Sequence, residues 1–349
     1  MILSTSYMPF LTRLRRLCPV AFMIATVFAA SATDSELSKY MPDIHGVVRA
    51  RWEMDTRHGE SRFQVRNARL SAGGDVAERF HYYMQADFCD RGSIRMLDAW
   101  ASADVTDGLN VRVGQFRMPF GYESFKGPAT YLFANRSFIG RYMNNVRAVG
   151  AQVAYRIPRI PVRLEAGVFN PTSITDHDKW VRTYAYAGKA TAEVGDWTLS
   201  TGFESLEPDS VRINLCNFAA QWQRGRWLLT AEYMYKHYTN GRHTPSHGYL
   251  VQGDFRAPLR HGIFNRISWQ MRMEGITDHS GGKRDDSGEL VTDQGLRNRL
   301  TLGTTVSHIR SRRLHVDFRV NYELNFYGHN TVIDNSTADR LVAEMVVSF

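Results

Sequence analysis

A strict alternation of apolar and polar side chains constrains this chain more than any other feature of its sequence. In residues 340–349, one face of an extended segment carries Glu344 and Ser348 beside two valines. The opposite face carries a continuous apolar row, which consists of Leu341, Ala343, Met345, Val347 and Phe349. Because successive side chains of a β-strand point to opposite sides, this pattern predicts a closing strand with one apolar face and an aromatic residue at its end.

The same two-residue rhythm recurs along most of the chain. Residues 314–326 alternate throughout, and this stretch is long enough to cross a bilayer, for which a tilted strand needs ~9–11 residues. About sixteen such strands are expected. They are predicted near residues 44–54, 61–72, 79–89, 94–104, 109–118, 147–157, 161–170, 179–193, 196–205, 211–223, 226–238, 247–256, 263–275, 294–307, 312–326 and 339–349.

The connections between these strands alternate between short and long. Short turns are predicted at residues 106–108, 158–160, 195–196 and 224–225. Longer connections are predicted at residues 119–146, 171–178, 239–246, 276–293 and 327–338. Short turns at one end and long loops at the other, with an even number of strands, are typical of an outer-membrane barrel. The alternation also breaks phase between Val65 and Ala68, which predicts a β-bulge there.

Composition alone does not separate a membrane barrel from a soluble protein. Apolar residues make up 43% of the chain, the mean hydropathy is −0.35, and no long apolar stretch follows the N-terminal segment. A soluble β-sandwich is the alternative, and it predicts apolar inner rows with ordinary polar outer rows. Here the polar rows carry charges of both signs, and tryptophan and tyrosine cluster towards strand ends, as in the aromatic girdles of a barrel. The sequence therefore predicts an all-β fold, a transmembrane antiparallel β-barrel.

The N-terminal residues resemble a cleaved secretory signal. Arg13, Arg15 and Arg16 precede a short apolar run, and Ala30-Ser31-Ala32 offers a cleavage site. We expect residues 1–32 to be a signal peptide and residues 33–349 to form one barrel domain. Removing the signal lowers the formal net charge from +8 by three arginines to +5. Export combined with a membrane barrel predicts location in the outer membrane of a Gram-negative cell.

One region carries a family resemblance. It contains Leu97-Asp98-Ala99-Trp100 and then Leu109-Asn-Val-Arg-Val-Gly-Gln-Phe-Arg-Met-Pro-Phe-Gly-Tyr-Glu123. This pattern resembles the phosphate-selective porin O and P family, and Arg136-Ser137, Arg147-Ala-Val-Gly150 and Gly167-Val-Phe-Asn170 extend the resemblance. Such porins often carry an Arg-Asp pair at the start of the sixth strand, where this chain has Arg147-Ala148.

The longest connection, residues 119–146, is the candidate constriction loop. A structureless segment of this length is unusual unless it is functional, and the resemblance implies a loop that folds into the lumen after the fifth strand. Pro119 suits a strand end, and Gly121 permits the turn that follows. An external loop is the alternative, because long barrel loops usually lie outside. The cationic candidates on this segment and at its end are Lys126, Arg136, Arg141 and Arg147.

Many arginines fall on the predicted inward rows of the barrel. We single out Arg49, Arg51, Arg112, Arg297 and Arg299 as pore-lining candidates. A guanidinium group binds oxyanions through a fork of donors and stays charged, so a ladder of such groups favours anion passage. Carboxylates such as Glu53, Glu274 and Glu323 share these rows. Pairing of arginines with wall carboxylates, which leaves little net selectivity, is therefore the second interpretation.

These features favour a passive diffusion porin for small hydrophilic solutes, with a preference for phosphate or similar anions. The alternatives are a plugged structural or adhesin barrel and an outer-membrane enzyme such as a phospholipase. No motif for catalysis, a cofactor or a metal is recognised, and neither the histidines of residues 237–247 nor Asp285-Asp286 has standard ligand spacing. The expected partners are membrane lipids, small anionic solutes, the assembly machinery through Phe349 and two further copies in a trimer, but not nucleic acid.

Overall fold

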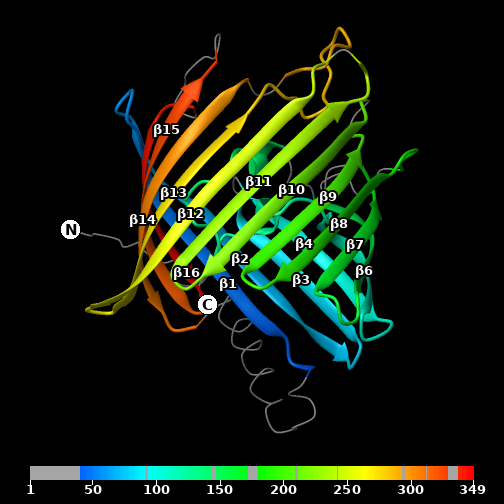
Figure 1. The fold of residues 1–349 in the computed structure, drawn as a ribbon, viewed down its shortest axis with the longest axis horizontal. Helices are drawn as coiled ribbons and strands as arrows, with labels where there is room; N and C mark the ends of the chain where they lie inside the picture. Colours follow the sequence, from blue (N-terminus) through cyan, green and yellow to red (C-terminus); the bar gives the residue numbers. More distant parts are fainter. Residues whose placement is uncertain are drawn as a thin grey trace, which may run out of the picture.

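The computed structural model is a single closed barrel of sixteen antiparallel strands, in which each strand pairs with its neighbours in sequence (Figure 1). The first strand also pairs with the last, so the sheet has no free edge. The fold class predicted from the alternation is confirmed. The structure describes residues 40–90, 93–143, 147–171, 180–208, 211–241, 243–292, 295–311, 313–328 and 337–349, and the predicted signal peptide lies outside them.

All sixteen predicted strands are present. They are β1 (Asp43–Asp55), β2 (Ser61–Ala77), β3 (Phe80–Asp90), β4 (Ser93–Asp104), β5 (Leu109–Arg117), β6 (Arg147–Arg156), β7 (Val162–Phe169), β8 (Ala185–Val194), β9 (Trp197–Leu206), β10 (Ile213–Arg224), β11 (Trp227–Tyr238), β12 (Ser246–His261), β13 (Phe264–Ile276), β14 (Arg297–Ile309), β15 (His315–Tyr327) and β16 (Arg340–Ser348). However, β2 runs to Ala77 rather than residue 72, and β8 begins at Ala185 rather than residue 179. Two short helical turns, η2 (Glu123–Phe125) and η3 (Ile139–Met143), lie between β5 and β6. Within the described residues, no helix has the length and apolar character needed to cross a membrane.

β12 runs further than predicted, to His261 rather than residue 256. The extension contains Pro258, and proline cannot donate to a strand ladder. In the structure, the register shifts between Pro258 and His261, and the shift accommodates the proline near the turn. The predicted bulge in β2 is confirmed, because Arg49 pairs with Asn67 and Ala50 pairs with Val65, which leaves Arg66 as the extra residue.

Closure of the barrel brings the two ends of the sheet together. β1 and β16 pair from Val47 opposite Ser348 to Asp55 opposite Arg340. Beyond β16, the Phe349 N–H donates to the Gly46 carbonyl at 3.0 Å, and the Gly46 N–H donates to the Phe349 carbonyl at 2.7 Å. The Phe349 ring occupies the space above Gly46, where a Cβ atom would lie 2.2 Å from the ring. A closed ladder satisfies the backbone groups internally, which is required in a bilayer.

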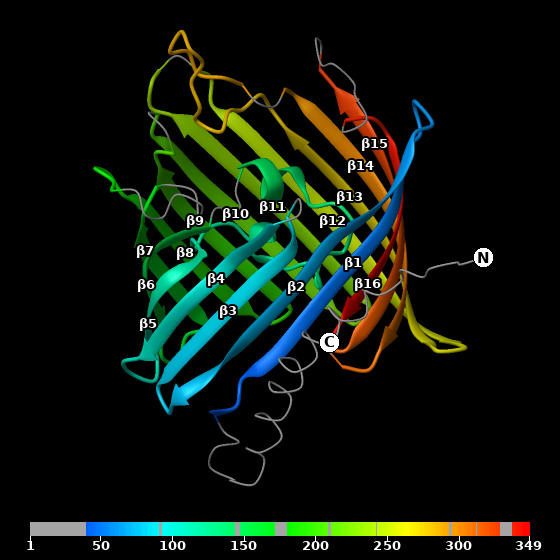
Figure 2. The same ribbon diagram turned by 180° about the vertical axis from the view of Figure 1, so that it is seen from behind.

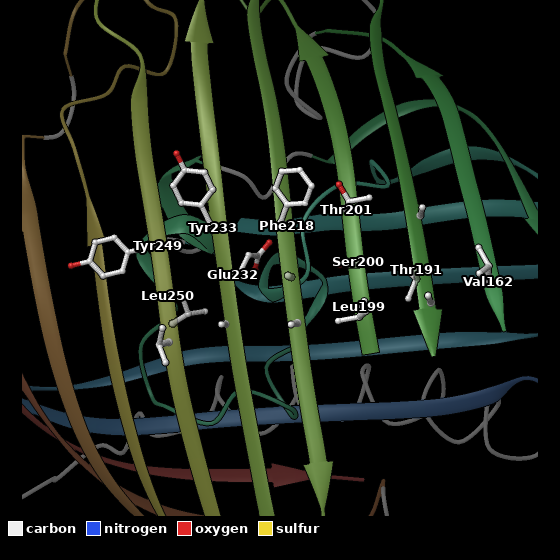
Figure 3. Close-up of a pocket in the computed structure, with 16 residues that line it drawn as sticks. Val162, Thr191, Leu199, Ser200, Thr201, Phe218, Glu232, Tyr233, Tyr249 and Leu250 are labelled. Atoms are coloured by element: carbon white, nitrogen blue, oxygen red, sulfur yellow. The ribbon is translucent and has the colours of Figure 1, made fainter. Parts of the chain in front are cut away.

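Burial in this barrel is inverted relative to a soluble protein. On β13, Arg272 points inward and is 1% exposed, whereas the neighbouring Met271 points outward and is 56% exposed. The same alternation is seen on β10 and β11, where Phe218 and Tyr233 surround a shallow depression of about 640 Å³ on the outer wall, while Glu232 is buried (Figure 3). An apolar exterior and a charged interior exclude the soluble sandwich and are typical of a membrane barrel.

The two ends of the barrel differ in their connections. At one end, which we call the short-turn end, the strands join through tight turns such as those at Gly195, Gly225 and Gly262. Each of these glycines has φ near +60°, with values of 58°, 58° and 57°. A glycine with positive φ at the first central position is characteristic of the type II′ hairpin turn. Most connections at the other end are longer, as predicted, but β3 and β4 are joined there through residues 91–92 alone. Both ends of the sheet, at Asp43 and Ser348, lie at the short-turn end.

Candidate pore lining

The connection between β5 and β6 runs inside the ring of strands, where Figure 2 shows it behind β3 and β4. Its described part, residues 118–143, is largely buried: Phe120 is 0% exposed and Phe133 is 1% exposed. The segment leaves β5 at Met118-Pro119, and Gly121 adopts a φ of 78°, which bends the chain at little steric cost. We call residues 118–143 the inner loop.

The beginning of the inner loop is held by β8 and β11. The Glu232 carboxylate of β11 accepts hydrogen bonds from the backbone N–H groups of Tyr122 and Glu123, both at 2.8 Å. Lys189 Nζ of β8 donates to the Gly121 carbonyl at 2.7 Å. Gln252 Nε2 of β12 donates to the Glu123 carboxylate at 3.2 Å. These contacts use buried wall charges to satisfy loop groups that would otherwise lack a partner.

The second half of the inner loop is held by four wall arginines and a glutamate. Arg49 donates to the Ala134 carbonyl at 2.5 Å, and Arg272 donates to the Asn135 carbonyl at 3.1 Å. Arg51 donates to Asn135 Oδ1 at 2.7 Å, and Arg299 donates to the Arg136 carbonyl at 2.7 Å. Glu274 accepts from the Phe138 N–H at 2.6 Å. We call Arg49, Arg51, Glu232, Arg272, Glu274 and Arg299 the anchor wall.

Several predicted pore arginines are also paired with carboxylates. Arg49 lies 2.7 Å from Glu344, and Arg51 lies 2.9 Å from Glu53. Arg299 contacts Glu274 at 2.7 Å and Glu323 at 3.2 Å. Arg147 binds Asp98 through two hydrogen bonds of 3.0 and 3.1 Å, and Lys126 lies 2.7 Å from Glu123. These residues are therefore paired with carboxylates, as the second interpretation of the sequence expects.

Other arginines have no carboxylate partner among the described residues. Arg112 stacks on Trp100 at 4.0 Å, and Arg141 lies over the Tyr142 ring at 5.0 Å. Arg136 lies 5.7 Å from the Tyr131 ring centre, and Arg117 donates only to the Lys126 carbonyl, at 3.3 Å. We call Arg112, Arg117, Arg136 and Arg141 the unpaired arginines.

The charge of Arg136 illustrates the electrostatic cost of this arrangement. Burial lowers the pKa of the Arg136 guanidinium below its ordinary value, and the positive charges of Arg147 and Arg69 lower it further. Tyr131 and Glu123 oppose this shift in pKa. Because arginine keeps its proton in proteins, the group remains a fixed cation, and an anion nearby would relieve the repulsion.

The residues that carry the family resemblance have packing roles in this wall. Phe116 packs edge to face on Phe169, with ring centres 5.4 Å apart. A Cβ atom on Gly150 would lie 2.2 Å from the Val168 carbonyl oxygen, and one on Gly114, where φ is 135°, would lie 2.3 Å from the Ala99 carbonyl oxygen. Glycine is therefore required at both positions. These contacts build the part of the wall from which the inner loop departs.

An apolar cluster fills the lumen beside β10–β13. It includes Ile139 and Met143 of the inner loop, Met234 and Leu250 of the wall, and Leu290 of the connection between β13 and β14. Arg297 is 5% exposed because it stacks on Phe138 at 3.9 Å, at the margin of this cluster. The cluster ties the inner loop to residues 277–292 of that connection.

Two residues that contact the inner loop are absent from the site residues predicted from the sequence. Arg117 was read only as part of the family-like motif, and Lys189 was not singled out at all, although both contact the inner loop. Alternation marks an inward side chain, but it does not indicate which inward side chain meets a loop that folds back from a distant position. Among the described residues, no group of three or more His, Cys, Asp or Glu side chains could hold a metal ion.

The closed barrel, with its apolar exterior and charged interior, has the architecture of outer-membrane β-barrels. The model of the family named phosphate-selective porin O and P matches residues 53–200, so the resemblance found in the sequence is confirmed over that region. The predicted location in the outer membrane agrees with this match and with the fold. No curated protein sequence matches the chain.

Solved structures share the fold at low sequence identity. OprB of Pseudomonas putida is 12% identical with a TM-score of 0.64, and the match covers 92% of this chain and 97% of that one. An anion-selective porin from Comamonas acidovorans is 13% identical with a TM-score of 0.58, covering 88% and 99%. The outer membrane channel DcaP of Acinetobacter baumannii is 12% identical with a TM-score of 0.58, covering 88% and 97%.

Proposed function

We propose that this protein is a diffusion porin of the outer membrane, and not an enzyme, which passes small hydrophilic solutes and prefers anions. One observation carries the proposal: within the described part of the chain, the four unpaired arginines have no carboxylate partner. Buried carboxylates such as Glu232 and Glu274 are occupied by backbone N–H groups and arginines of the anchor wall. The surplus of fixed charge near the inner loop is therefore positive.

A positive surplus at a narrow point favours anions. Fixed charges in a poorly screened pore lower the barrier for counter-ions and raise it for ions of like charge. We propose that the inner loop narrows the pore, because its backbone is fastened to the wall at both halves. The anchoring arginines Arg49, Arg51 and Arg299 then shape the constriction, while Arg112, Arg136 and Arg141 act on the solute. Phosphate or a similar oxyanion fits the guanidinium fork.

The remaining expectations concern assembly. In this proposal, residues 1–32 direct export and are removed, and the short-turn end faces the periplasm. The exterior contacts lipid, and the aromatic Phe349 serves as the element that the assembly machinery recognises. A trimer of such barrels is expected from the family resemblance.

The test is the reversal potential of the purified barrel in planar bilayers under a gradient of potassium chloride. An anion-preferring channel gives a potential whose sign corresponds to chloride permeation, together with a steady open-channel current. A reversal potential of the cation sign would contradict the anion preference. The measurement needs no knowledge of the physiological solute.

A plugged barrel is the second candidate, and the apolar cluster around Ile139 and Leu250 favours it. This cluster joins the inner loop to the connection between β13 and β14 across part of the lumen. Absence of any current from a barrel that is folded and inserted would support the plugged alternative over the porin.

A further inference from the structure

A polar cavity lies beside the inner loop, towards the short-turn end. It has a volume of about 340 Å³ and is lined by residues 129–132 of the inner loop and by inward side chains of β12, β13, β14 and β15. The register places its charged residues in adjacent rows: Arg256 is opposite Ser268, and Arg266 is opposite Ser307. We call this space the lower cavity.

Both carboxylates of the lower cavity already have arginine partners. Asp254 Oδ2 lies 2.5 Å from Arg256 Nε, and Asp317 Oδ2 lies 2.7 Å from Arg319 Nη2. Ser307 also donates to Asp317 Oδ1 at 2.7 Å. Among the described residues, Arg256 occupies Asp254 Oδ2 but Asp254 Oδ1 has no hydrogen-bond partner, whereas both oxygens of Asp317 are occupied.

Arg266 is the arginine of the lower cavity that takes part in neither of these ion pairs. Among the described residues it has no carboxylate partner, and its one hydrogen bond, from Nη2 to the Ser307 hydroxyl, is long at 3.4 Å. Its Nε atom is buried without a hydrogen-bond acceptor. A ligand or water in the cavity would supply the missing acceptor. Of the three arginines and two aspartates that line the lower cavity, Arg266 is the one whose charge no salt bridge compensates; Arg319 also lies 3.5 Å from Glu344, and His315 lies 3.9 Å from Asp317.

We propose that the lower cavity binds a small organic monoanion, with its carboxylate on Arg266 and its short apolar chain against Leu132 and Tyr131. The roof formed by the inner loop supplies the apolar part of the lining, since Ala129, Tyr131 and Leu132 all border the cavity. A single added negative charge matches the single uncompensated positive charge. A dianion such as phosphate meets the two aspartates as well, and their repulsion disfavours it.

This inference rests on the proposed function only in that the lumen must admit solutes. The test is a ligand-observed NMR titration of the detergent-folded barrel with butyrate, compared with 1-butanol, butylammonium and inorganic phosphate. We expect butyrate to bind more tightly than all three. Butyrate binding that is no tighter than that of 1-butanol, or tighter binding of butylammonium or phosphate, would overturn the assignment.

Variants locate the site. R266Q is expected to weaken butyrate binding about tenfold or more, because hydrogen bonds to a charged group are the strong ones. R163Q is the matched control, since Arg163 is an inward arginine near the same end of the barrel on β7 and lies outside the lower cavity. Equal weakening in both variants would show a general effect of charge and would overturn the site.

A second variant, in the inner loop, tests the site independently of whether R266Q folds. A129W changes only the inner loop and places a large ring in the roof of the lower cavity, so it should abolish butyrate binding while the strands are untouched. Unchanged binding in A129W would overturn the proposal. Conductance measured on the same samples separates the two ideas: a conducting channel without butyrate binding defeats only this inference, and butyrate binding in a barrel that carries no current defeats only the proposed function.

Discussion

The anchor wall and the unpaired arginines contain the same kind of side chain, yet they have opposite relations to their surroundings. Arg49 and Arg299 of the anchor wall each combine a carboxylate partner with a backbone carbonyl of the inner loop. Arg112 and Arg141 have aromatic rings beside them and no carboxylate among the described residues. The difference indicates that Arg49 and Arg299 fasten the inner loop, whereas Arg112 and Arg141 remain available to a solute.

The physical reason for the division is the cost of burying charge. A guanidinium that is enclosed needs both an opposite charge and acceptors for its remaining donors, and removing one member of such a set is strongly destabilising. Arg272, at 1% exposure, has Glu274 at 3.0 Å as its opposite charge, and its Nη1 donates to the Asn135 carbonyl. An arginine that lies against an aromatic face keeps part of its hydration and its donors for an anion.

The largest effect is expected from a change that prevents closure of the barrel, because the anchor wall and the unpaired arginines are then both lost. Deleting Phe349 removes the two backbone hydrogen bonds with Gly46 and the ring that covers this glycine. We predict that most of the truncated protein fails to assemble, as measured by heat-modifiable migration of outer-membrane fractions. F349Y, which keeps an aromatic ring, should assemble normally. Normal assembly of the truncated chain would remove the role assigned to the terminal residue.

A strong effect is also expected from breaking the anchor wall alone. E274A removes the acceptor of the Phe138 N–H and the partner of both Arg272 and Arg299. Leaving buried charges uncompensated typically costs about 3–5 kcal/mol, so we predict that the second half of the inner loop detaches. Single-channel conductance should rise and become noisier, while heat-modifiable migration shows that the barrel persists.

The matched control for this substitution is E165A. Glu165 also faces inward and pairs with an arginine, Arg163, at 3.2 Å, but that arginine side chain is 43% exposed and neither residue is part of the anchor wall. Its removal should leave conductance near that of the wild type. If E274A and E165A gave the same conductance, the anchor wall would not hold the inner loop in the membrane.

A smaller effect is expected from neutralising unpaired arginines. The triple variant R112Q/R136Q/R141Q should lower the ratio of anion to cation permeability by about threefold or more, because charges at a narrow point act over less than the ~8 Å screening length. K283Q, on the connection between β13 and β14, is the control, since Lys283 is exposed. Equal shifts of the reversal potential in the triple variant and in K283Q would place the selectivity elsewhere.

The strands could be predicted from the sequence because the alternation within each strand shows which residues face outward and which face inward. Alternation located the row of β16 from Leu341 to Val347, and the phase break before Ala68 located the bulge at Arg66. Both signals are local, so they need no knowledge of which strands are neighbours.

The division between the anchor wall and the unpaired arginines could not be predicted in the same way. It depends on hydrogen bonds between residues far apart in the chain, such as Arg49 and the Ala134 carbonyl or Glu274 and the Phe138 N–H. Arg49 and Arg112 are equivalent in the alternation pattern. Only the path of the inner loop decides that Arg49 meets a backbone carbonyl and Arg112 meets Trp100.

The smallest predicted effect is a difference in pH dependence between the unpaired arginines and the fastening of the inner loop. The unpaired arginines do not titrate in the accessible range, so anion preference should be constant between about pH 5 and 8. His279 lies on the connection between β13 and β14, with its ring 6.1 Å from that of Tyr142 in the inner loop. Burial, together with the nearby charges of Lys236 and Arg297, lowers the pKa of His279 from 6.5 to about 3.

A histidine whose pKa is depressed in the folded state stabilises that state above its unfolded pKa, and the contribution is lost as the pH falls below about 6.5 towards 3. We therefore predict that the contact between His279 and the inner loop weakens between pH 7 and pH 5, by up to about 1.4 kcal/mol per pH unit. Hydrogen exchange of residues 277–292 should then be faster at pH 5, after correction for the intrinsic rate. H279F, which keeps an aromatic ring without a titrating group, should lose this dependence, and the reversal potential should not change in either protein. If acid altered the selectivity as well, the two regions would be coupled and the contrast between them would fail.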